Sequence, residues 1–85
     1  MAVGGELEEM AQLSRTFADN ATSATTIRTT VNNVLTTTTW TGPAADRFRD
    51  AWNQFAPSLD QLSQALSDAG QEVQRRREAL DNATR

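Results

Sequence analysis

The chain has 85 residues, enough for one domain, and its hydrophobic fraction of 38%, much of it Ala, predicts a thin core. It contains no Cys and no His, which excludes disulfides, the usual zinc ligands and an imidazole base, so we predict a protein that is not an enzyme and uses no cofactor or metal. Eight basic residues against eleven acidic ones give a net charge of −3, which argues against nucleic acid or an anionic membrane as a partner.

The N-terminal segment, MAVGGELEEMAQL, has neither the basic region nor the apolar region of a Sec signal peptide. No later stretch approaches the roughly 20 apolar residues of a membrane span. We therefore expect a protein without a cleavable signal peptide and without stable membrane insertion. Taken alone, this pattern would suggest a cytoplasmic protein, although export systems that accept folded substrates need no such peptide.

Apolar residues spaced three and four apart predict a first helix at about residues 5–39. Its C-terminal half is unusual, because Thr fills 10 of the 20 positions from 22 to 41 and Thr favours strands over helices. A strand across TTVNNVLTTTTW is the competing interpretation. The helical spacing of Val31, Val34 and Leu35 favours the helix, with a weak last turn at 36–39.

The segment TTTTWTGPAADRFRD predicts a turn at residues 40–42. Pro43 suits the first turn of a following helix, where its missing N–H would have no partner. It also disfavours a helical conformation at Gly42, which as a glycine tolerates turn geometries closed to other residues. Trp40 can lie across the end of the apolar seam.

Downstream, a second helix at about 43–82 has apolar residues at alternating intervals of four and three from Phe48 to Leu80, interrupted only by Arg76. Pro57 lies within it. The chain could break there, with residues 58–61 capping a third helix. Because the apolar spacing continues in phase from Phe55 to Leu59, we predict a kink in one helix.

We therefore predict an all-α chain, with residues 1–85 forming a single antiparallel helix-turn-helix hairpin. Folding it at about residue 41 would place Val34 against Phe48, Val31 against Trp52, and Ile27 against Phe55. Two helices have no second layer to pack on, so part of their apolar surface would remain exposed to solvent. Dimerisation into a four-helix bundle would cover it. The residues predicted to form the hairpin and dimer seam are Met10, Leu13, Phe17, Ile27, Val31, Val34, Phe48, Trp52, Phe55, Leu59, Leu62, Leu66 and Val73.

Trp40-Thr41-Gly42 between two amphipathic helices, in a short chain without Cys, resembles the WXG family of ESAT-like proteins. The turn motif would comprise Trp40, Gly42 and Pro43. The resemblance implies a small substrate of a type VII (ESX) secretion system that pairs with a second WXG-type chain and is exported by a membrane ATPase. It would be secreted, and a pool of it would be present in the cytoplasm before export. All of the basic residues are Arg, and the chain is rich in Ala and Thr; this composition is typical of a high-GC actinobacterium.

The chain departs from many exported members of that family, which carry a Tyr-x-x-x-Asp/Glu motif after the second helix. It contains no Tyr, and the matching positions fall on Val73 and Arg77. Members that lack the motif usually accompany one that has it, so the resemblance favours a heterodimer over a homodimer. Leu80 would extend beyond the part of the second helix that the first can cover. Val73, Arg77 and Leu80 are therefore a candidate C-terminal recognition arm.

Two alternatives remain open. One is a cytosolic helical adaptor or antitoxin-like binding module with the same hairpin and no export. The other is a structural coiled-coil subunit, against which the interruptions at Asn20, Pro57 and Arg76 argue.

Overall fold

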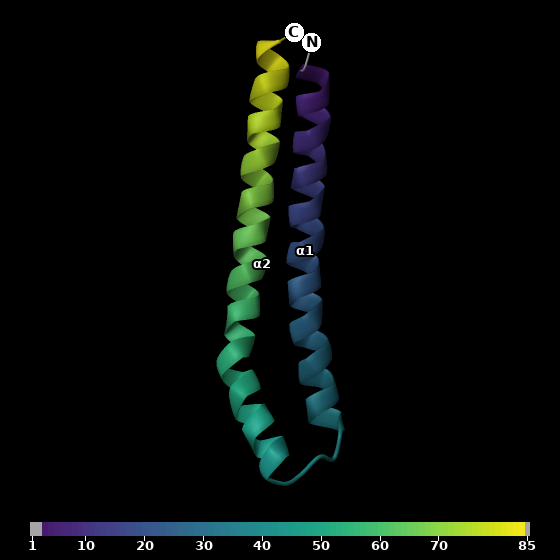
Figure 1. Cartoon of the computed structure of the whole chain (residues 1–85), viewed down its shortest axis with the longest axis vertical. Helices are drawn as coiled ribbons and strands as arrows, with labels where there is room; N and C mark the ends of the chain where they lie inside the picture. The colour runs from purple at the N-terminus through teal and green to yellow at the C-terminus, as the bar shows by residue number, and fades with distance from the viewer. Residues whose placement is uncertain (1–2, 85) are drawn as a thin grey trace.

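The computed structural model describes residues 3–84, which form two antiparallel helices, α1 (Val3–Thr37) and α2 (Pro43–Ala83), joined by a short connection (Figure 1). The molecule is a rod of 63 × 16 × 16 Å with both chain ends at one end and the turn at the other. No strand occurs among the described residues, in agreement with the predicted all-α hairpin. In residues 3–84, neither helix offers a stretch long and apolar enough to span a bilayer.

The Thr-rich part of α1 is helical, so the strand alternative is wrong. Several of its hydroxyls donate to carbonyls one turn earlier: Thr36 to Asn32 at 2.8 Å and Thr37 to Asn33 at 2.9 Å. Such bonds satisfy the hydroxyl within the helix, which is how Thr is accommodated there. The helix begins at Val3 and ends at Thr37, two residues before the predicted limit of 39.

α2 is one helix through Pro57, so the alternative of a break and a third helix is wrong. The ring lacks the N–H that would bond to the carbonyl of Asn53, and such a lost bond bends a helix. Pro57 is exposed, where water can reach the freed carbonyl, and α2 is visibly curved (Figure 1).

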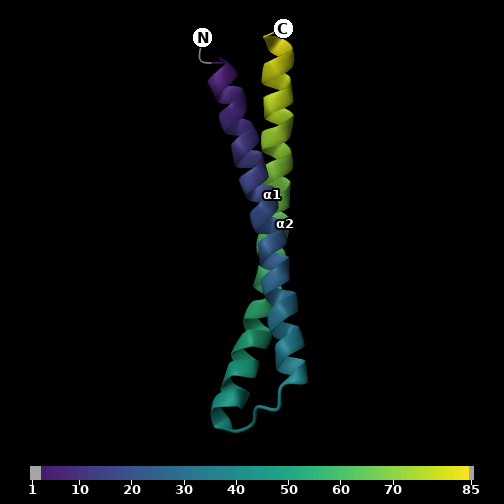
Figure 2. The ribbon, with the colours of Figure 1, turned by 90° about the vertical axis from the view of Figure 1, so that its right-hand side faces the viewer.

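Small residues form much of the seam between the helices. A Cβ placed on Gly70 would lie 3.3 Å from the carbonyl oxygen of Ser14 and 3.4 Å from the Cβ of Phe17, so the backbones approach closely there. Figure 2 shows the two helices crossing and separating towards their ends. Nearer the turn, a core cluster consists of Trp52, Ala56 and Leu59, with Val31 and Leu35 packed against it. The other buried residues of the described part of the chain are Ala21, Ala24, Ala45 and Gly70.

Hydrogen bonds between the helices define their register. Arg77 donates to the carbonyl of Leu7 at 3.1 Å, and Ser14 donates to the carbonyl of Gly70 at 3.0 Å. In both pairs the midpoint of the two residue numbers is 42. The chain therefore folds back one residue later than the point predicted from the sequence.

Two of the predicted facing pairs do not fill the seam. Val34 and Phe48 are 56% and 42% exposed, and Ile27 and Phe55 are 50% and 54% exposed. Ala21, Ala45, Ala56 and other small side chains lie in the seam at these levels, which lets the helices pack closely and leaves these four larger residues outside. Val31, which was predicted to face Trp52, packs against the core cluster that contains Trp52.

Candidate functional site

The connection between the helices depends on one glycine. Gly42 has φ 111° and ψ 174°, a conformation that is essentially restricted to glycine. Pro43 follows at the start of α2, where a missing N–H leaves no gap in the ladder. The N–H of Asp46 donates to the carbonyl of Gly42 at 3.0 Å and closes the first turn. The Gly-Pro pair thus ends one helix and begins the next.

Trp40 lies in this connection and is 41% exposed. Its ring centroid is 5.9 Å from that of Phe48, and the guanidinium carbon of Arg49 lies 5.7 Å from the Trp40 ring centroid. Arg49 also donates to the backbone carbonyl of Trp40 at 2.6 Å. Arg49 therefore contacts Trp40 at both its ring and its backbone carbonyl. This role was not predicted from the sequence. Its signal was its spacing, because Arg49 shares a heptad position with the buried Ala56.

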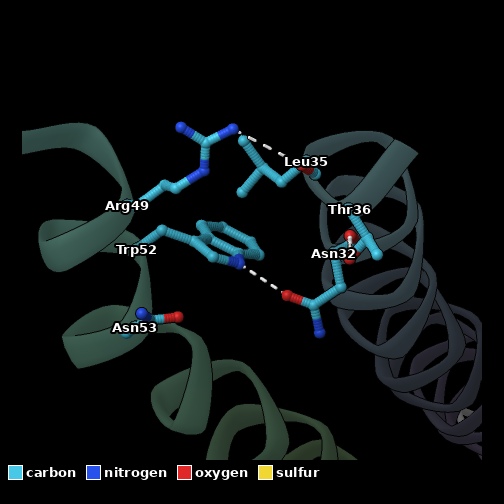
Figure 3. A pocket seen from close by; sticks show the side chains of 6 residues that line it. All are labelled: Asn32, Leu35, Thr36, Arg49, Trp52 and Asn53. Carbon is cyan, nitrogen blue, oxygen red and sulfur yellow. Dashed lines mark hydrogen bonds between the residues drawn. The ribbon is translucent and has the colours of Figure 1, made fainter. Parts of the chain in front are cut away.

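A shallow cleft of about 460 Å³ opens between the helices near the turn (Figure 3). Trp52 lies across it and donates from Nε1 to Oδ1 of Asn32 at 2.7 Å. Its lining comprises Asn32, Leu35, Thr36, Arg49, Trp52 and Asn53. These residues include no carboxylate and no activated nucleophile, so the cleft contains no acid-base pair. Across residues 3–84, no three acidic side chains gather as a metal site.

Besides Trp40 in the turn, six large apolar side chains on the two helices are between 42% and 56% exposed. They recur mainly at seven-residue intervals on both helices, an interval that keeps residues on one side of a helix in a coiled pair. We call this surface the apolar face; it consists of Leu13, Ile27 and Val34 on α1 and Phe48, Phe55 and Leu62 on α2.

Both halves of the apolar face lie on the same side of the hairpin. On each helix the exposed residue precedes a seam residue by four positions, as Ile27 precedes Val31 and Phe48 precedes Trp52. Two antiparallel helices are related by an approximate two-fold axis perpendicular to their common plane. Because the exposed residues have the same four-residue spacing from the seam on both helices, the two halves of the apolar face lie on one side. On the other flank of the seam lie Asn32, Asn53 and Asp60, which are polar.

Polar pairs link the helices beside this second flank. The hydroxyls of Thr25 and Ser63 are 3.0 Å apart, and Arg28 forms an ion pair with Asp60. The hairpin therefore has one apolar side and one side that is already bonded within the chain.

The predicted seam residues divide between the two surfaces. The exposed ones form the apolar face, while Trp52 and Leu59 are buried. The others are half-buried between the helices: Met10, Phe17, Val31, Leu66 and Val73.

The candidate C-terminal arm is engaged in the hairpin. Val73, Arg77 and Leu80 are half-buried, and Arg77 bonds to Leu7 as described above. Because α1 starts at Val3 rather than at residue 5, it extends further alongside the end of α2 than expected.

Charge gathers near the chain ends. Glu72 accepts hydrogen bonds from Arg75 at 2.9 Å and Arg76 at 3.2 Å. These bonds, that from Arg75 foremost, lower the pKa of the Glu72 carboxyl. Arg76 lies in the same heptad series as Phe48, Phe55 and Leu62, so a cation terminates the α2 half of the apolar face.

Comparison with known proteins identifies a family. A family model described as "WXG100: Proteins of 100 residues with WXG" matches residues 5–83, which include the turn and nearly all of both helices. No curated protein and no solved structure matches the chain.

Proposed function

Because the chain belongs to the WXG100 family, we propose that it is a substrate of a type VII (ESX) secretion system, exported as the partner subunit of a helical-hairpin dimer. Membership itself implies a small, non-enzymatic helical protein of the type VII secreted kind, and members typically pair with another WXG protein. The match over residues 5–83, with Trp40-Thr41-Gly42 at the turn of a two-helix hairpin, is the observation that carries the proposal.

The apolar face supports the pairing part of the proposal. Monomeric soluble proteins rarely leave a contiguous apolar patch of several hundred Å² uncovered. Here two phenylalanines and four aliphatic side chains, each roughly half exposed, lie on one side of a hairpin that has no second layer. Packing against another hairpin would convert this face into the core of a four-helix bundle.

The partner-subunit role is supported by what occupies the positions of the export motif. Val73 and Arg77 stand where a Tyr and an acid would be, and Arg77 is bonded to α1. We propose that a Tyr-bearing WXG-type chain supplies the main signal for the secretion ATPase and that this chain accompanies it. A heterodimer is therefore the exported form, drawn from a cytoplasmic pool.

The test is secretion of the tagged chain from a host with an ESX system, with and without its genomic WXG-type neighbour. Culture filtrates are compared between a strain with the intact ATPase and one with the ATPase gene deleted, with a cytosolic enzyme as the lysis control. We expect the chain in the filtrate only when both the ATPase and the neighbour are present. Retention in the cells of every strain would refute the proposal and favour the cytosolic adaptor.

A deletion distinguishes the role of this chain's C-terminal residues from that of the partner's C-terminal segment. Removing residues 78–85 leaves the bond from Arg77 to Leu7 available, so we expect export to weaken only modestly. Removing the partner's own tail should stop export of both chains. If the short deletion alone blocks secretion while the affinity of the dimer is unchanged, this chain carries its own signal and the partner-subunit assignment is wrong.

A further inference from the structure

The last turn of α1, residues 34–37, contains no basic residue. The final carbonyls of a helix have no partner within the helix, and together they carry a partial negative charge that a cation stabilises. One of them, the carbonyl of Val34, accepts the N–H of Thr38 at 3.0 Å. The carbonyls that follow need partners from another part of the chain or from water.

Arg49 of α2 provides a cation to this end of α1 from the other helix. Its Nη2 donates to the carbonyl of Leu35 at 3.5 Å (Figure 3), and its Nη1 donates to the carbonyl of Trp40 at 2.6 Å. The planar fork of Arg holds its donors in fixed directions, so both bonds form from one side-chain conformation. One guanidinium thus bonds the end of α1 and the connection that follows it.

The surroundings of Arg49 suit this role. The side chain is half-buried, and no ion pair within residues 3–84 involves it. Arg49 is the seventh residue of α2, beyond the first turn, where the positive end of that helix would oppose a cation. Its charge therefore lies where it stabilises the end of α1 without destabilising the start of α2.

The same guanidinium also contacts the ring of Trp40. Its carbon lies 5.7 Å from the ring centroid, within the range in which an aromatic ring attracts a cation. The ring of Phe48, 5.9 Å away and tilted by 48°, is the other neighbour. Because Trp40 lies in the connection, no helical backbone holds it. Its position depends on these two contacts, although 41% of the residue is exposed.

We propose that Arg49 is a C-terminal cap of α1 supplied by α2, and that it is the positioning residue for Trp40 of the turn motif. Without it, the last turn of α1 would have no cation, and Phe48 alone would hold the Trp40 ring. The competing explanation is that Gly42 and Pro43 define the turn by themselves. The proposal concerns the order of the turn within this chain and does not depend on export.

Nuclear magnetic resonance of the purified, ¹⁵N-labelled chain tests the positioning of Trp40. The variant is Arg49→Met, which keeps an unbranched stem and removes the charge and the donors. The control is Arg47→Met, because Arg47 is exposed two residues earlier and its loss removes the same charge from the same helix. We expect the order parameter of the Trp40 amide to fall from about 0.85 to below about 0.6 in Arg49→Met and to stay unchanged in the control.

The two indole N–H groups of the chain provide an internal reference. The heteronuclear NOE of the Trp52 indole should be unchanged in Arg49→Met, because its Nε1 still donates to Asn32. That of the Trp40 indole should fall, and a Trp40→Phe variant assigns the two signals. If the amide and indole of Trp40 were as ordered in Arg49→Met as in the wild type, the proposal would be overturned and the Gly-Pro pair would fix the turn by itself.

Hydrogen exchange at the amide of Thr38 tests the cap. Arg49→Met should accelerate exchange about two- to fivefold, the factor expected when a helix C-terminus loses a cation. Arg49→Lys keeps the charge but not the planar fork, so it should restore most of the protection at Thr38 while the Trp40 indole stays mobile. Equal exchange in all three proteins would overturn the cap. Circular dichroism checks that each variant is folded; if Arg49→Met loses the hairpin, Arg49→Lys carries the test of Trp40, and a fully ordered indole in it would refute the positioning role.

Discussion

Replacing Gly42 with Ala isolates the backbone strain of the turn. A Cβ at this position would meet no atom within 4 Å, so any penalty comes from the φ of 111° and ψ of 174°. Holding an L-residue other than glycine in this region costs about 1–3 kcal/mol. For a chain of this size each kcal/mol lowers the melting temperature by about 4–8 °C. Thermal unfolding followed by circular dichroism measures the loss; the protein concentration is held fixed because any pairing of chains would make stability depend on it.

Gly5→Ala is the matched control. Gly5 is within α1, and a Cβ there also meets no atom within 4 Å. The same substitution in a helix gains up to about 1 kcal/mol of intrinsic propensity. The two variants should therefore shift the melting temperature in opposite directions. If Gly42→Ala were as stable as Gly5→Ala, the turn would not depend on a glycine-only conformation and the reasoning would fail.

Three further perturbations test individual contacts. Trp40→Ala should cost about half of the 3–5 kcal/mol typical of a fully buried aromatic ring, because 41% of Trp40 is exposed; urea unfolding measures it, and a full-size loss would contradict the geometry. A double-mutant cycle with Arg28→Ala and Asp60→Ala should give a coupling of at most about 1 kcal/mol, because both side chains reach solvent. The lowered pKa of Glu72 makes its contribution to stability full above the unfolded pKa and lost as pH falls through the folded pKa. Glu72→Gln should therefore flatten that part of the acid limb of a stability-pH curve, and an unchanged limb would count against the pairing with Arg75.

The hairpin and its turn were predictable because they depend on strong local signals. Pro43 suits the first turn of a helix and disfavours a helical conformation at the residue before it, and Gly42 supplies a conformation that other residues avoid. The unbroken phase of apolar residues across Pro57 also outweighed the proline as a helix breaker. These signals act within a few residues and need no knowledge of the partner helix.

The helicity of the Thr-rich segment was harder to predict because propensity alone opposes it. Thr36 and Thr37 stay helical by bonding to carbonyls one turn earlier, an option that a propensity scale averages with all other contexts. Packing of Val31 and Leu35 on the Trp52 cluster adds a tertiary contribution that no local window contains.

The division between seam and exposed face could not be read from hydrophobicity, because the closest helix contacts are made by residues with little of it. Gly70 touches the backbone of α1, and Ala56 is only 3% exposed. On each helix, apolar residues recur at two adjacent sets of positions. The helices pack through the set that faces small residues of the other helix, because these permit a shorter distance between the helix axes. Phe55 and Leu62 are left outside for the same reason. The packing of the hairpin thus leaves six large apolar side chains of its two helices between 42% and 56% exposed, although Trp52 and Leu59 lie in the seam.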